Sequence, residues 1–161
     1  MAGCIAQTTN NFLSAAGVAF NATIMPVKVM DNTGNAPISA EVDGIYFATN
    51  NGVNIISMSL GGPGTDVNEQ ATVTYAYNNG VTLICSAGNG VNGVGTNVPE
   101  YPASYPECIP VSAIRYDYTL PTYFNYGTYI DFCSPGGDLS VDQNVDGYGD
   151  GICSKHIMGL T

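Results

Sequence analysis

An acidic, glycine-rich segment near the end of the chain has the residue spacing of a cation-binding loop. Its candidate ligands are Asp142, Asn144, Asp146, the carbonyl of Tyr148, and Asp150, with Gly147 at the turn. This is the first half of an EF-hand pattern, whose oxygen ligands suit Ca²⁺. Position 12 of that pattern is Cys153 and not a bidentate glutamate. We therefore expect Ca²⁺ to bind here, and a solvated acidic turn is the alternative.

Two further segments have backbones that a peptide could approach closely. They contain Ser59, Leu60, Gly61 and Gly62 in the first, and Ala87, Gly88 and Asn89 in the second. Glycine has no side chain to block another backbone, so the first segment could accept an extended peptide as an added strand. The second ends in a carboxamide, which is a neutral N–H donor. The alternative is that both segments are only turns that leave two strands.

These glycine-rich turns do not have the features of a phosphate site. Neither matches G-x-G-x-x-G or G-x-x-x-x-G-K-[ST], and no lysine or arginine lies between Lys28 and Arg115. Asp66 and Glu69, which follow the first turn, would repel a phosphate. We therefore expect no nucleotide and no organic cofactor.

Two copies of one supersecondary unit would position the turns. Each copy has an apolar pattern of helical spacing, then an Asn-Asn-Gly-Val stop at 50–53 or 78–81, then a short apolar run. Ser39 is the candidate N-cap of the first helix. Asp66, with Glu69 three residues later, indicates a capping box at the start of the second helix.

The apolar runs at 53–58 and 81–87 are typical of strands buried on both faces. Further strands are expected at 22–30, 108–114 and 129–133. Helix, glycine stop and buried strand in repetition predict right-handed crossovers in a parallel sheet. We expect one α/β domain, three-layer, with a mainly parallel sheet flanked by helices. Ligands would then bind beyond the carboxyl ends of the strands, where both turns lie.

Composition excludes several partners. Three basic residues against 13 acidic ones give a formal charge of −10, which argues against nucleic acid and anionic membrane surfaces. No apolar run approaches about 18 residues, so we expect no membrane span, and the first residues do not resemble a signal peptide. Five cysteines without C-x-x-C spacing do not indicate zinc. Cys85 and Cys108 are expected to be buried free thiols, with participation in disulfide bridges as the alternative.

Several motifs in register along the chain resemble the subtilisin-like serine peptidases. Residues 54–62, Asn-Ile-Ile-Ser-Met-Ser-Leu-Gly-Gly, are similar to that family's substrate-edge strand, and residues 81–89 resemble its oxyanion-hole strand. Matches at 2–7, 22–30, 101–103 and 134–137 extend the resemblance from residue 2 to about residue 151. The resemblance implies a subtilisin-like fold, peptide-bond hydrolysis as the family reaction, and a secreted, extracellular location.

The resemblance also implies roles for individual residues. Asn89 would donate its side-chain N–H to the oxyanion of a tetrahedral intermediate. Residues 59–62 would line one side of a cleft for an extended peptide or protein strand, and Ala87 and Gly88 would belong to the primary specificity pocket. The opposite edge would contain Gly34 and Asn35, next to Ala36, where the family often has a second glycine. Asn11 matches a second calcium site.

The family's proton-transfer machinery does not occur in these 161 residues. That machinery is an Asp, a His and a Ser. The family's His belongs to H-G-T-H and its Ser to G-T-S-M-A, and neither motif is present. The single histidine, His156, is two residues from Ser154, a spacing that does not favour a hydrogen bond between their side chains.

We therefore expect a partial peptidase domain over residues 1–161, inactive alone, with an acidic loop at 138–151 and an irregular tail at 152–161. The alternatives are a calcium-dependent peptide-binding or structural module and one part of a split protease. A partial domain leaves sheet edges or helix-binding faces uncovered, so we also expect self-association.

Overall fold

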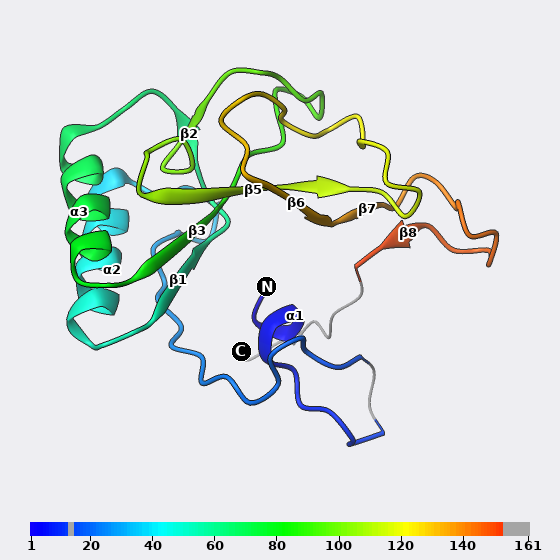
Figure 1. Cartoon of the computed structure of the whole chain (residues 1–161), viewed down its shortest axis with the longest axis horizontal. Coiled ribbons are helices and arrows are strands. Elements are labelled where there is room, and N and C mark those ends of the chain that lie inside the picture. Colours follow the sequence, from blue (N-terminus) through cyan, green and yellow to red (C-terminus); the bar gives the residue numbers. More distant parts are fainter. Residues whose placement is uncertain (13–14, 153–161) are drawn as a thin grey trace.

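A four-stranded parallel sheet forms the centre of the computed structural model, which describes residues 1–12 and 15–152 (Figure 1). The strands are β1 (Ile55–Met58), β3 (Thr82–Ser86), β5 (Cys108–Ile114) and β6 (Phe132–Pro135), in the order β1-β3-β5-β6. Their three pairings are all parallel. The prediction of an α/β fold with a mainly parallel sheet flanked by helices is confirmed.

Two helices lie side by side against one face of this sheet (Figure 1). They are α2 (Ile38–Asn50) and α3 (Val67–Asn78), whereas α1 (Ala2–Ala6) is a short helix that lies apart from them. Two small antiparallel pairs complete the described elements: β2 (Gly62–Pro63) with β4 (Glu100–Tyr101), and β7 (Gly137–Asp138) with β8 (Asp150–Gly151).

The repeated Asn-Asn-Gly-Val stop ends α2 and α3 in the same way. Asn51 and Asn79 each donate a side-chain N–H to the carbonyl four residues earlier, at 2.8 Å in both helices. Gly52 and Gly80 follow with φ angles of 74° and 80°, a left-handed conformation that glycine adopts without steric cost. The predicted internal repeat is therefore a repeat of the helix terminus that turns the chain into the next strand.

The two predicted helix starts have different outcomes. Asp66 is the N-cap of α3, and its carboxylate accepts hydrogen bonds from the backbone N–H groups of Asn68 and Glu69 at 2.8 and 3.1 Å. The prediction of Ser39 as N-cap is wrong, because the N-cap of α2 is Pro37, two residues earlier, which has no side-chain acceptor. Proline is favourable there because its fixed φ suits the extended entry to a helix.

Several strand predictions also need correction. Residues 22–30 do not form a strand: Pro26 has no N–H to donate, and no described strand pairs with the segment. The strand predicted at 129–133 begins only at Phe132 and ends at Pro135. The strands predicted at 53–58 and 81–87 are shorter at their ends, and the one at 108–114 is confirmed.

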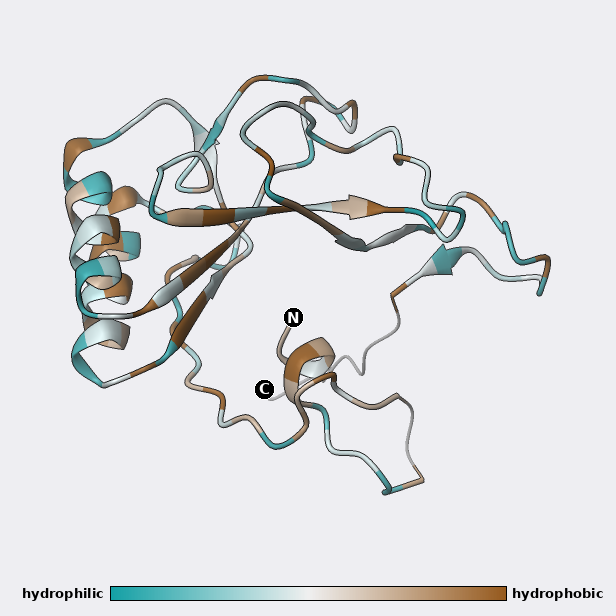
Figure 2. Cartoon of the chain, viewed as in Figure 1, coloured by the Kyte–Doolittle hydropathy of each residue, from teal (hydrophilic) through white to brown (hydrophobic). Residues whose placement is uncertain are grey.

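The core lies between the sheet and the two large helices. Val73 and Ala76 of α3 are fully buried against Leu83 and Cys85 of β3, and Figure 2 shows hydrophobic residues along much of β3 and β5. Cys85 and Cys108 are buried and unpaired, as predicted. The other residues of β3, which are Thr82, Ile84 and Ser86, are half-buried or exposed. The predicted burial of this strand on both faces is therefore only partly confirmed.

β1 is an edge strand of the sheet, and Ile55 at its start is 58% exposed. Self-association through such an edge stays a prediction.

Within residues 1–12 and 15–152, the helices are too short or too polar to cross a membrane.

Two buried carboxyl groups meet between α2 and α3. Glu41 and Glu69 lie in the first turns of these helices and are 8% and 4% exposed. Burial, together with the charge of Glu69, raises the pKa of Glu41 from 4.5 to about 7. The hydroxyl of Tyr105 lies 2.9 Å from a Glu69 oxygen and can donate to it. Glu41 is therefore the carboxyl group that holds a proton at mildly acidic pH.

We expect the stability of the chain to fall as the pH rises from about 5 to about 8. In this range the folded chain keeps a proton on Glu41 that the unfolded chain has lost, so each rise in pH favours unfolding. The variant Glu41→Gln mimics the protonated form. Urea unfolding should show that the free energy of unfolding of the natural chain falls by about 1 kcal/mol more than that of the variant.

Asp43→Asn is the matched control, because Asp43 lies on the same helix with an exposed side chain. An identical pH dependence in the natural chain and in Glu41→Gln would contradict the assignment of the proton to Glu41.

Candidate functional site

The first two strands of the sheet bring the two glycine-containing turns to one end of the molecule. β1 and β3 are parallel, and Met58 is paired with Cys85, so residues 59–62 and residues 87–89 both leave the sheet at its carboxyl end. This is the end at which open parallel sheets bind ligands. The structure therefore brings together the two segments that the sequence predicted to act together.

The first turn is closed on one side and open on the other. A Cβ atom at Gly61 would lie 2.9 Å from the carbonyl oxygen of Tyr101, so β4 packs directly against this glycine. A Cβ atom at Gly62 would meet nothing within 4 Å. Leu60 is half-buried against the core, and the Ser59 hydroxyl contacts the sulfur of Met1 at the start of α1. Space for a ligand is therefore open at Gly62.

The second turn presents a free amide group. Ala87 is buried, and its N–H donates to the carbonyl of Val111 at 2.9 Å. Gly88 has a φ of 93°, and a side chain there would collide with Glu100 and Asn125. Asn89 is exposed, and its carboxamide has no hydrogen-bond partner among the described residues. The N–H donors of Asn89 are therefore available to a ligand.

A buried asparagine, which sequence reasoning missed, ties this turn to its surroundings. Asn125 is 0% exposed, and its side-chain N–H groups donate to the Ala87 carbonyl at 2.9 Å and to Glu100 Oε1 at 2.8 Å. Its Oδ1 accepts from the backbone N–H of Thr96 at 2.9 Å. No local pattern marks Asn125, because asparagine is common in loops and its partners are distant in sequence.

The predicted opposite edge is a self-contained exposed turn. Asp31 accepts hydrogen bonds from the backbone N–H groups of Thr33 and Asn35 at 2.8 and 3.0 Å, and Gly34 has a φ of 87°. In the described part of the chain, no hydrogen bond joins Gly34 or Asn35 to residues 59–62 or 87–89. The turn is formed as a loop, but the role of these two residues stays a prediction.

The acidic loop is organised around its own backbone. Asp142 accepts from the N–H groups of Asp146 and Gly147 at 3.1 and 2.8 Å, and Asn144 Oδ1 accepts from the Asp146 N–H at 3.0 Å. The Asp146 carboxylate accepts from the Tyr148 N–H at 2.9 Å. Three predicted ligands are therefore held by hydrogen bonds within one loop, with their side-chain oxygens accepting from its backbone.

The remaining predicted ligands lie elsewhere. Asp150 belongs to the short strand β8, and its carboxylate accepts from the Gln143 N–H at 2.5 Å. Asn11 is exposed and lies in a bend of the N-terminal segment, not in the acidic loop. Over residues 1–12 and 15–152, no three His, Cys, Asp or Glu side chains form a metal-binding group. The oxygen donors suit Ca²⁺, but the carboxylates are not gathered around one point.

The loop predicted at 138–151 also contains regular structure, since β7 and β8 pair across it. The predicted irregular tail falls almost wholly on residues 153–161, which include Cys153, Ser154 and His156 and lie outside the described residues.

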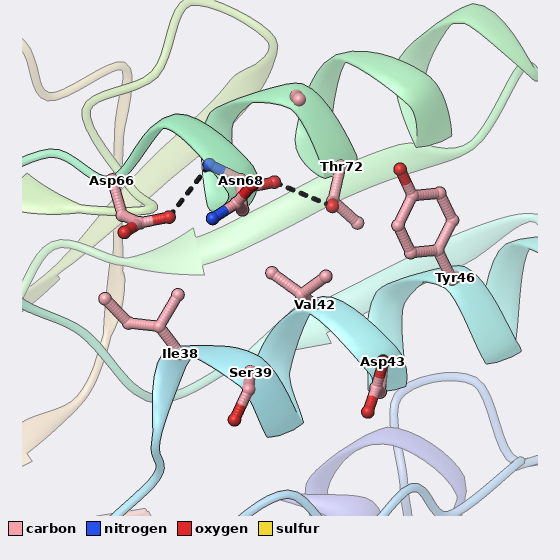
Figure 3. Close-up of a pocket in the computed structure, with 9 residues that line it drawn as sticks. Ile38, Ser39, Val42, Asp43, Tyr46, Asp66, Asn68 and Thr72 are labelled. Carbon is pink, nitrogen blue, oxygen red and sulfur yellow. Dashed lines mark hydrogen bonds between the residues drawn. The ribbon is translucent and has the colours of Figure 1, made fainter.

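A cavity of about 420 Å³ opens between α2 and α3, away from both turns (Figure 3). Ile38 and Val42 point across it toward α3, where Asp66 and Thr72 are hydrogen-bonded to the helix backbone. None of the predicted site residues lines it. A smaller cavity of about 170 Å³ is lined in part by Ala87, Gly88 and Asn89, so the second turn faces a concave surface.

Comparison with known proteins relates this chain to one family of peptidases. The model of the Subtilase family matches residues 1–156. Thermitase of Thermoactinomyces vulgaris is 32% identical over 163 aligned positions, which cover 99% of this chain and 57% of thermitase. A thermophilic serine proteinase of Bacillus sp. (strain AK1) is 35% identical over 165 positions, which cover 99% of this chain and 40% of that protein.

Solved structures agree. The psychrophilic subtilisin-like protease Apa1 from the Antarctic psychrotroph Pseudoalteromonas sp. AS-11 superimposes with a TM-score of 0.75 at 35% identity, over 85% of this chain and 31% of that one. The chain spans 57% and 40% of the lengths of the two relatives above, which is about half.

Asn125→Ala should weaken the fold at the site. The substitution leaves the buried Ala87 carbonyl and the Thr96 N–H without their partner, which costs about 2 to 4 kcal/mol in free energy of unfolding. Urea unfolding measures this loss. Asn54→Ala is the control, because Asn54 is exposed and should change stability by less than about 0.5 kcal/mol. If both variants unfolded at the same urea concentration, Asn125 would not have the structural role assigned to it.

Proposed function

This chain belongs to the subtilase family of subtilisin-like serine peptidases, and we propose that it provides a peptide-binding cleft without hydrolysing the peptide. Residues 59–62 would hold an extended peptide as an added strand, through backbone hydrogen bonds. Asn89 would donate its side-chain N–H to a carbonyl oxygen of that peptide. As the family resemblance implies, the protein would act outside the cell.

One observation carries this proposal. The unpartnered carboxamide of Asn89 and the open space at Gly62 lie at the same end of two adjacent parallel strands. A buried or satisfied Asn89 would have no donor to offer, and a filled space at Gly62 would leave no room for a peptide. The combination favours a binding site over two ordinary turns.

The inference that these 161 residues do not hydrolyse the peptide is supported by their motifs. Those that hold the family's His and Ser do not occur among them. Removing the Ser–His–Asp machinery lowers the rate by about 10⁶, a value measured on a subtilisin and not on this chain. A remaining oxyanion donor cannot compensate for that loss.

Peptide binding can be measured by fluorescence anisotropy with labelled alanine hexapeptides that carry lysine or norleucine at the fourth position. We expect saturable binding of at least one peptide and no cleavage. Gly62→Val should weaken binding about tenfold, because the new side chain occupies the open space that the peptide needs. Asn54→Val, at the other end of β1, is the matched control.

Binding that is unchanged in Gly62→Val would place the peptide elsewhere, and the failure of both peptides to bind would refute the proposal. Cleavage by the chain alone would refute the inactive assignment. Cleavage that appears only after mixing with other segments of a subtilase domain would favour the alternative of a split protease.

We further propose that the acidic loop binds Ca²⁺ through Asp142, Asn144, Asp146 and the Tyr148 carbonyl. The proximity of the first three residues within one hydrogen-bonded loop, and the oxygen chemistry of their side chains, support this. Asp150 would have to leave the Gln143 N–H to join them. When bound, the ion would offset the repulsion between aspartates that have no lysine or arginine within the loop.

Isothermal titration calorimetry should detect Ca²⁺ binding with a dissociation constant of about 10⁻⁴ to 10⁻³ M, as in weak extracellular sites. Asp146→Asn should weaken it, because a neutral amide replaces a central carboxylate. Asp31→Asn is the matched control, since Asp31 caps a similar exposed turn elsewhere. The absence of heat on titration, or equal weakening by both variants, would exclude the loop as a calcium site.

A further inference from the structure

The carboxylate of Glu100 lies between the two turns of the proposed cleft. Glu100 is half-buried in β4, directly across from Pro63 of β2. Its Oε2 atom lies 3.9 Å from the position of a Cβ at Gly61, and a Cβ at Gly88 would collide with the same carboxylate. The carboxylate therefore packs directly against Gly88 and reaches ordinary contact distance of Gly61, between the two turns.

The two oxygens of this carboxylate have different surroundings. Oε1 accepts a hydrogen bond from Asn125 at 2.8 Å, which fixes the orientation of the group. Oε2 has no hydrogen-bond partner among the residues that the structure describes. One oxygen is therefore held by the fold, and the other is free to accept a hydrogen bond from a ligand.

No cation of the described chain neutralises Glu100. Arg115 pairs with Asp138 at 2.6 Å, and the ammonium group of Lys28 donates to the Met30 carbonyl. The polar groups near Glu100 are neutral: Asn125, and Tyr129, whose pKa is raised by burial and by the Glu100 charge. A half-buried carboxylate without a counter-ion favours a positively charged ligand group.

We propose that Glu100 is a specificity-determining residue that selects a lysine or arginine side chain of the bound peptide. The ammonium or guanidinium group of that side chain would approach Oε2 from the Gly61 side, where the contact is looser, and donate a hydrogen bond to it. This inference rests on the proposed function and adds the substrate class: extended peptides with a basic residue beside Asn89.

The labelled hexapeptides described above test the selection, because norleucine has the length of lysine without its charge. We expect the lysine peptide to bind about tenfold more tightly than the norleucine peptide, since a charged hydrogen bond is made only with lysine. This advantage should shrink between about 0.05 M and about 0.5 M NaCl. A third peptide, with glutamate at the same position, should bind most weakly.

Glu100→Gln removes the charge but keeps a side-chain oxygen that can accept from Asn125. Thermal unfolding should therefore show an intact fold, the lysine advantage should disappear, and the affinity for the norleucine peptide should stay unchanged. Asp131→Asn removes the same unit of charge from an exposed residue and is the control for net charge. That variant should keep the lysine advantage.

The outcomes separate this inference from the proposed function. If both peptides bind with equal affinity, the cleft exists but Glu100 does not select a basic side chain. If Glu100→Gln and Asp131→Asn reduce the lysine advantage equally, the selection comes from overall charge, and the inference is overturned. If neither peptide binds, the proposed function fails and this inference fails with it.

Discussion

The hydrogen bonds of one buried side chain hold the candidate site in shape. Asn125 joins the carbonyl at the end of β3 to the carboxylate of Glu100 on β4 and to the backbone at Thr96. These three groups come from separate parts of the chain, and the carbonyl of the buried Ala87 in particular would be costly to leave without a partner. The orientation of Gly88 and of Glu100, and with it the geometry of the cleft, depends on this asparagine.

The sequence predicted the features that are encoded locally. Helical spacing followed by Asn-Asn-Gly-Val predicted α2, α3 and the strands after them, because each stop satisfies its own helix terminus. Residues 22–30 have the composition of a strand but do not form one, since a strand exists only when another strand pairs with it. Asn125 and Glu100 could not be found, because their roles come from contacts between residues that are 25 to 38 positions apart.

Charge is arranged in two distinct ways in this acidic chain. Between the helices, Glu41 and Glu69 face each other with no described cation nearby, and a retained proton reduces their repulsion. At the cleft, Glu100 is only half-buried and has one free oxygen, so a ligand can neutralise it from outside. Burial and neighbours together set the state of a carboxyl group, since Asp138 is as buried as Glu41 but is paired with Arg115.

A peptide that lies along residues 59–62 and reaches Asn89 can be detected by a two-dimensional ¹H–¹⁵N NMR titration of the labelled chain with the lysine hexapeptide. We expect shifts of the Gly61 and Gly62 backbone amides and of the Asn89 side-chain NH₂ group, with the amides of α2 and α3 unchanged. Shifts confined to the cavity between α2 and α3, with Asn89 unaffected, would contradict this expectation.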